Sequence, residues 1–230
     1  MYFCHADAIW ADYPELVPAV VHARGITSKP AAGPRLTTYY EIAESRLATT
    51  SEGELVPIQA WRRVFSRMGL KPTQYRSAAE SLLRRFRKEK SLPQIHPLID
   101  VCNAISVAYA IPIAVFDVSK IADYVEVRYA TGAETYLSFS GETENPEPGE
   151  VIFADSAGRA HARRWTNRQS RYSAIDDGTM AALIVAEGVH GSANEDLAKV
   201  GAAIAGELNA LWSVPAAARV LTRSSARFEF

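Results

Sequence analysis

The hydrophobic pattern of this chain changes its period near residue 111, and this change limits the folds that the chain can adopt. Before that point, apolar side chains mostly recur every three or four residues, as in amphipathic helices. After it, they mainly alternate with polar ones or form short continuous runs, as in strands. The sequence therefore predicts an α+β fold in which helices mainly from the first half pack on a β-sheet from the second half.

The expected elements follow from these periods and from the positions of Gly and Pro. Helices are expected at residues 36–49, 54–68, 75–88, 97–110 and 194–213. Strands are expected at residues 16–26, 112–117, 124–129, 135–139, 150–153, 159–165, 180–189 and 217–223. Loops are expected at residues 29–35 and 140–149, where Gly and Pro gather. No repeat or long linker divides the 230 residues, so we expect a single domain over residues 1–230.

Basic residues are concentrated between residues 62 and 90. This segment holds ten Lys and Arg residues against two Glu residues, a net charge of +8, whereas the whole chain has a net charge of −1. The other residues therefore carry −9. Such a concentration is typical of a phosphate-binding surface, and Trp61, Phe65, Tyr75 and Phe86 are interleaved with it. A solvated helix face is the alternative interpretation. Residues 134–150 hold five acidic residues and no basic one, so we expect that loop to avoid nucleic acid.

Several classes of function are excluded by missing motifs. The chain has no dinucleotide-binding, P-loop, zincin or nucleophile-elbow motif. Its five histidines are scattered, and its two cysteines fit neither a disulfide framework nor a zinc site. We therefore expect no cofactor and no metal. No apolar run reaches the roughly 18–20 residues of a membrane span, and no signal peptide is recognisable, so a cytoplasmic protein without a membrane partner is expected.

Polar residues set into apolar runs are the first candidates for a site. They are Asp100, Asn103, Asp117, Arg128 and Asp155. A buried polar group must be hydrogen-bonded or functional. Capping and strand-end hydrogen bonding would explain each of them separately, whereas together they predict a polar cleft between a helix and the sheet.

Four short segments carry a family resemblance. Residues 92–103 read Leu-Pro-Gln-Ile-His-Pro-Leu-Ile-Asp-Val-Cys-Asn, and residues 111–117 read Ile-Pro-Ile-Ala-Val-Phe-Asp. Val-Arg-Tyr-Ala follows at 127–130 and Val-Ile-Phe-Ala-Asp at 151–155. Their order and spacing over about residues 60–190 resemble the B3/B4 domain of the phenylalanyl-tRNA synthetase β subunit. The segments at residues 76–85 and 165–168 resemble free-standing B3/B4-domain proteins.

The resemblance implies a B3/B4-like fold with an amino-acid-sized pocket beside a tRNA 3′ end. In the synthetase, this module hydrolyses tyrosine that has been attached to the tRNA for phenylalanine. The resemblance therefore implies tRNA as a partner through residues 62–90, an aminoacyl ester or amino acid in the pocket, and no DNA partner. It does not imply aminoacylation.

The family's pocket residues carry over only in part. Asn103 matches the asparagine that lines the editing pocket, and Pro112 matches a family proline. Cys102 replaces a threonine and Ala114 replaces a histidine, while a family glutamate corresponds to Arg168 or Gln169. Because groups that read a tyrosine hydroxyl are missing, we expect a substrate other than that of the synthetase.

Three sets of site residues follow from the polar residues, the resemblance and the basic segment. The expected catalytic residues are Asn103, Asp100, Arg168 and Thr179. The expected substrate-pocket residues are Cys102, Pro112, Ala114, Asp117 and Arg128. The expected RNA-binding residues are Arg62, Arg63, Arg76, Arg84, Arg85, Arg87 and Lys88.

Three hypotheses for the function stay open at this point. The first is trans-editing, the hydrolysis of a mischarged aminoacyl-tRNA by a positioned water and a stabilised oxyanion. The second is a tRNA- or RNA-binding module without chemistry. The third is a protein that binds a small molecule such as an amino acid.

Overall fold

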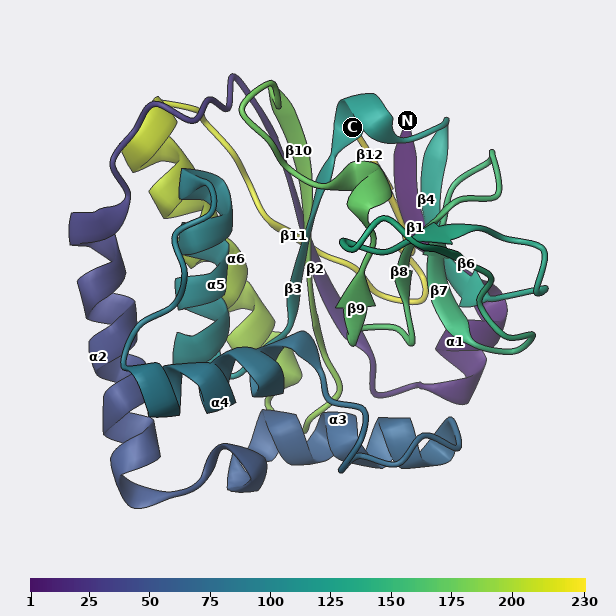
Figure 1. Cartoon of the computed structure of the whole chain (residues 1–230), viewed down its shortest axis with the longest axis horizontal. Helices are drawn as coiled ribbons and strands as arrows, with labels where there is room; N and C mark the ends of the chain where they lie inside the picture. Colours follow the sequence, from purple (N-terminus) through teal and green to yellow (C-terminus); the bar gives the residue numbers. More distant parts are fainter.

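Three layers of secondary structure form the protein: a group of helices, a four-stranded sheet and a six-stranded sheet (Figure 1). A computed structural model describes all residues from 1 to 230. The strands are β1 (Tyr2–His5), β2 (Val17–Arg24), β3 (Ile113–Asp117), β4 (Tyr124–Tyr129), β5 (Tyr136–Leu137), β6 (Thr143–Glu144), β7 (Val151–Ala154), β8 (Ala160–Arg163), β9 (Arg168–Gln169), β10 (Ala181–Gly188), β11 (Arg219–Val220) and β12 (Arg227–Glu229). The α-helices are α1 (Asp7–Asp12), α2 (Gly33–Thr49), α3 (Val56–Arg67), α4 (Ala78–Glu89), α5 (Pro97–Tyr109) and α6 (Ala193–Trp212). The mixed α+β architecture predicted from the change of period is confirmed.

The four-stranded sheet is the central layer, with the strand order β11-β2-β10-β3. Strands β2 and β10 pair antiparallel along eight residues, with Val21 opposite Ile184. Side chains alternate across a strand, so Val20, Leu183 and Val185 enter the core between the two sheets, whereas Val21 and Ile184 enter the core beneath the helices. A sheet buried on both faces needs apolar residues at successive positions, which explains the continuous apolar runs that predicted these two strands.

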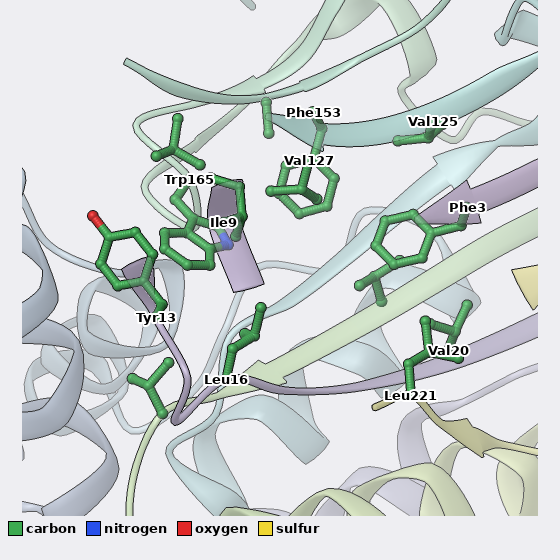
Figure 2. Close-up of a cluster of buried hydrophobic side chains, with 14 of the residues drawn as sticks. Phe3, Ile9, Tyr13, Leu16, Val20, Val125, Val127, Phe153, Trp165 and Leu221 are labelled. Carbon is green, nitrogen blue, oxygen red and sulfur yellow. The ribbon is translucent and has the colours of Figure 1, made fainter. Parts of the chain in front are cut away.

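The core between the sheets is rich in aromatic side chains (Figure 2). Phe3 from β1 and Phe153 from β7 stack with their ring centroids 6.2 Å apart. Tyr13 meets the edge of Trp165 at 4.8 Å. Leu221, near the C-terminus, belongs to the same cluster. The ends of the chain and its middle therefore contribute to one core.

Small residues bring the helices close to the central sheet. Helices α2, α5 and α6 lie on one side of this sheet, while α3 and α4 cross one end of the molecule (Figure 1). A β-carbon added to Gly201 of α6 would lie 2.4 Å from the β-carbon of Ala218 and 3.9 Å from that of Ala19. Any larger residue at this position would push the helix away from the segment that leads into β11.

The structure corrects three details of the predicted elements. Helix α2 begins at Gly33, inside the predicted loop 29–35, because Pro34 occupies the first turn, where its missing N–H removes no hydrogen bond. Strand β6 lies inside the predicted loop 140–149 and pairs with β5. Strand β1, which no sequence pattern predicted, adds Tyr2–His5 to the six-stranded sheet.

The six-stranded sheet joins the two ends of the chain. Its order is β12-β1-β4-β7-β8-β9. Strand β1 pairs parallel with β4 and antiparallel with β12, and the N–H of Phe230 donates to the carbonyl of Met1 over 3.1 Å. The N- and C-termini accordingly lie close together in Figure 1. None of the six helices has both the length and the apolar character that crossing a membrane requires.

Candidate functional site

A small cavity lies between the two sheets, at the end of the central sheet where β3 begins. Its walls include Pro112, Ala114, Phe153, Trp165 and Val185. Its volume is about 40 Å³. Because one water molecule needs roughly 10–15 Å³ of such volume, the cavity has room for about three groups of that size. The walls are mostly apolar, and the polar lining comes from residues 166–169 and Glu187.

The rim of the cavity is a strained turn between β8 and β9. Trp165 has a left-handed backbone with φ of 57°, which costs a non-glycine residue roughly 1–2 kcal/mol. Two hydrogen bonds hold this turn against the start of α4: the N–H of Ala78 donates to the carbonyl of Thr166, and Nδ2 of Asn167 donates to the carbonyl of Arg76, each over 2.7 Å. The turn that shapes the cavity is thus fixed to the first residue of a basic helix.

The edges of the two sheets meet beside the cavity. Strand β3 is the edge of the central sheet, and β9 is the edge of the six-stranded sheet. Nε2 of Gln169 in β9 donates a hydrogen bond to the carbonyl of Val115 in β3 over 2.5 Å. This hydrogen bond links the edges of the two sheets, so the distance between them does not depend on apolar packing alone.

Glu187 is the one acidic residue that lines the cavity, and no sequence pattern predicted a role for it. Its side chain is 2 % exposed. Its Oε1 atom accepts hydrogen bonds from Nε1 of Trp165 over 2.9 Å and from Nε2 of His5 over 2.7 Å. Its backbone carbonyl accepts from Nε1 of Trp61 over 3.3 Å. The only indication of this residue in the sequence is that it is a single charge near the end of the apolar run 180–189.

Three of the residues expected from the sequence line this cavity: Pro112, Ala114 and Arg168. Arg168 lies in the rim with 44 % of its side chain exposed. Its guanidinium is 3.3 Å from Oε1 of Glu144 and lies over the ring of Tyr136, 5.5 Å from the centroid. The cavity therefore combines a buried carboxylate with a partly exposed guanidinium at its rim.

Asp117 and Thr179 lie at the other end of β3. Since a strand rises about 3.3 Å per residue, Asp117 is roughly 10 Å along the strand from Ala114. Thr179 donates to Oδ2 of Asp117 over 2.7 Å, and the Ser119 hydroxyl donates to Oδ1 over 2.6 Å. Burial raises the pKa of Asp117, but these hydrogen bonds outweigh it and leave the pKa below its usual value. The two residues form a network that connects β3 to the loop before β10.

The expected residues of α5 lie outside the cavity as well. Asp100 accepts a hydrogen bond from the N–H of Ile95 over 2.8 Å, and burial raises the pKa of its carboxyl group. Cys102 is buried in the core beneath the helices, where burial raises its pKa to about 12. Asn103 is half-buried on the same helix and is not part of the cavity wall.

Arg128 belongs to a separate ion pair in the six-stranded sheet. Its Nη1 atom is 2.5 Å from Oε1 of Glu134. The backbone N–H groups of Thr131 and Gly132 also donate to Glu134, over 3.0 and 3.1 Å. Burial raises the pKa of Glu134, but these partners lower it to about 2. The polar residues that predicted one cleft are therefore distributed over several local networks.

Helices α3 and α4 carry most of the basic segment, and acidic residues pair with part of it. Glu80 accepts from Arg62 at 2.7 Å and lies 3.3 Å from Arg76. Glu52 lies 3.4 Å from Arg84 and 2.9 Å from Arg87, whose side chains are half exposed.

The remaining basic residues of α3 and α4 differ in their partners, and Arg67 pairs with Glu15. Arg85 pairs with Glu89 at 2.9 Å, whereas Arg63 and Lys88 are exposed and make no ion pair. Trp61, Phe65 and Phe86 are buried in the core. Three of the four interleaved aromatic rings are thus unavailable for stacking on bases.

Comparisons with known proteins match this chain to one domain family and to one kind of tRNA ligase subunit. A family model described as the B3/4 domain matches residues 60–200. The phenylalanine–tRNA ligase β subunit of Cereibacter sphaeroides is 33% identical over 66 residues, which are 29% of this chain and 8% of that protein. The same subunit from Bradyrhizobium diazoefficiens is 36% identical over 67 residues, again 29% and 8%. The matched segment is thus less than a tenth of either relative.

One solved structure covers more of the chain. It is an N-terminal fragment of the phenylalanyl-tRNA synthetase β subunit from Pyrococcus horikoshii, with a TM-score of 0.48 and 11% sequence identity. The alignment covers 93% of this chain and 49% of that one.

Proposed function

The chain belongs to the B3/4 domain family, whose model matches more than half of it, and from this premise we propose that it acts on aminoacylated tRNA. In this proposal, the basic segment binds the RNA, and the cavity between the sheets receives the aminoacyl group and allows its ester to be hydrolysed. The whole chain, residues 1–230, acts as one domain in this function.

The observation that carries the proposal is the position of α4 at the rim of the cavity. The first residue of α4, Ala78, lines the cavity, and the carbonyl of Arg76 just before it is bonded to the rim. The basic residues of α4, Arg84 to Lys88, lie further along the same helix. An RNA strand bound along α4 through its phosphates would therefore bring its end to the cavity mouth, which is the arrangement that an enzyme acting on a 3′ ester needs.

The chemistry we assign to the cavity is hydrolysis by a positioned water. Ester hydrolysis requires a water near the carbonyl carbon and a donor that stabilises the developing oxyanion. The cavity volume allows a water beside a small group. Arg168 at the rim carries guanidinium N–H donors suited to the oxyanion or to the terminal phosphate. Catalytic roles for Asn103, Asp100 and Thr179 stay predictions from the sequence.

A second candidate function is tRNA binding without hydrolysis. The observation that favours it is Ala114, an apolar residue of the cavity wall at the position where the family resemblance expects a histidine. A methyl group can neither donate nor accept a hydrogen bond to water.

The test is a panel of correctly and incorrectly charged tRNAs incubated with the folded protein, with loss of the ester followed over time. We expect faster ester loss for a subset of the mischarged tRNAs. If no charged tRNA loses its amino acid faster than in buffer, hydrolysis is rejected. Salt-dependent binding of the same tRNAs would then leave the second candidate function, and absence of binding at low salt would reject both.

A further inference from the structure

The Glu187 carboxylate is buried at the cavity without a Lys or Arg partner. The Glu80 and Glu134 carboxylates each pair with an arginine, whereas Glu187 receives only the two ring N–H groups of Trp165 and His5. Both fall on Oε1. A buried charge is costly unless it is paired, so a carboxylate kept in this state at a cavity wall fits the binding of a positive group from outside.

His5 is the one group beside Glu187 that could carry a positive charge, since its Nε2 atom lies 2.7 Å from Oε1. Its other ring nitrogen, Nδ1, is buried and has no hydrogen-bond partner, so it is an unpaired donor in a protonated ring and an unpaired acceptor in a neutral one. We take the ring as neutral and donating from Nε2, so that the pair of His5 and Glu187 carries a net negative charge.

The cavity also restricts the size of the group that carries the charge. Beside Glu187 its walls are apolar, formed by Ala114, Ala162 and Val185 among others. Its volume of about 40 Å³ has room for an ammonium group, the carbon that bears it and one methyl-sized group. A phenol or phenyl ring exceeds this space. A metal ion is a poorer fit, because no cluster of three or more ligating side chains occurs in the structure.

We propose that the cavity binds the α-ammonium group of a small amino acid, with Glu187 as its counter-ion and the apolar walls accepting a side chain no larger than that of alanine. This assignment rests on the proposed function in one respect, since both use the same cavity. The ammonium group has two possible sources, a free amino acid derivative and the aminoacyl ester on tRNA. Arg168, which lines the same cavity, has guanidinium donors for the carbonyl oxygen of either one.

The experiment compares three amides by titration under ligand-observed NMR. Alaninamide carries the ammonium and a methyl group, propionamide has the same shape without the ammonium, and tyrosinamide has the ammonium and a large ring. The protein variants are Glu187→Gln, which keeps an acceptor for both ring N–H groups, and Glu142→Gln, an exposed carboxylate outside the cavity as the matched control. Ala114→Leu fills the cavity without changing charge.

We expect alaninamide to bind the wild-type protein at least tenfold more tightly than propionamide or tyrosinamide. This preference for the ammonium should be lost in E187Q and kept in E142Q, and A114L should bind none of the three. Equal affinity for alaninamide and propionamide, tighter binding of tyrosinamide, or no binding of alaninamide at all would overturn the assignment. The amide comparison on the wild-type protein decides the question even if a variant fails to fold.

A second arm separates the assignment from the proposed function. An acceptor stem that carries a non-hydrolysable alanyl amide is titrated beside the same stem without alanine. Binding of alaninamide together with failure to bind either stem would reject the tRNA function and leave the ammonium site. Binding of both stems with equal affinity, without alaninamide binding, would reject the ammonium site and leave the tRNA function.

Discussion

Stability measurements on two substitutions can decide whether the buried pair of Glu187 and His5 carries a net negative charge. Glu187→Gln keeps an oxygen acceptor for Trp165 Nε1 and His5 Nε2 and removes the charge. Glu187→Ala removes the acceptor as well. The two variants therefore separate the effect of the charge from that of the hydrogen bonds.

The expected magnitudes follow from the contacts. In E187A, two buried N–H groups lose their acceptor, and each unsatisfied donor costs about 1–3 kcal/mol, so we expect a loss of about 2–6 kcal/mol. In E187Q, the hydrogen bonds weaken, but an unpaired buried charge disappears. We expect its free energy of unfolding to stay within about 1 kcal/mol of the wild-type value or to exceed it.

Urea unfolding at pH 7, followed by tryptophan fluorescence, measures both differences. If His5 were protonated, Glu187→Gln would break a buried ion pair, and such losses amount to about 3–5 kcal/mol. A loss of that size in E187Q would refute the neutral His5 and, with it, the uncompensated negative charge of the cavity. A loss in E187A no larger than that in E187Q would refute the role of the two hydrogen bonds.

Three other variants test further parts of the structure. Replacing Arg84, Arg85 and Arg87 by Glu changes the basic segment from +8 to +2; if the three contact phosphates, filter-binding titrations should show the slope of log K against log salt becoming about 2–3 units shallower, and unchanged affinity would contradict the proposed RNA surface. Although burial raises the pKa of Glu134, its hydrogen bonds lower it from 4.5 to about 2, so this group stabilises the fold fully above pH 4.5 and loses about 3 kcal/mol of that contribution as the pH falls through 2. Denaturant unfolding at several pH values should therefore show a weaker acid dependence in Glu134→Gln, and an identical one would refute the assignment. Gly201→Val places methyl groups where even a β-carbon lies 2.4 Å from a neighbouring alanine, so calorimetry should show a destabilisation of about 1–3 kcal/mol, and an unchanged melting temperature would contradict this close contact.

Most of the longer elements could be predicted because their signals are local. The expected helix 54–68 occurs as α3 over Val56–Arg67, and the expected strand 124–129 occurs with the same bounds as β4. Strands β1 and β12 were missed, since each has only three or four residues and depends on pairing with a segment far away in the sequence. Such pairings leave no periodic pattern in a short segment.

The site was only partly predictable, for a different reason. Pro112, Ala114 and Arg168 were found through a family resemblance, and they line one cavity. Glu187 was missed because the run around it indicated only a buried strand. Asp117 shows the opposite case: a carboxylate at a strand end predicted a pocket, whereas the hydroxyl groups of Ser119 and Thr179 satisfy it away from the cavity. Burial and partners, not residue type, separate these cases.

The pairing of β1 with β12 bears on how this fold can be combined with other chains. Because the first and last strands lie side by side, the two ends leave the domain at almost the same point, and a host protein could hold it within a single surface loop. The same adjacency makes the fold suitable for circular permutation: a short linker joining the ends, with new termini opened at the exposed residues 140–142 between β5 and β6, should leave both sheets and the cavity intact.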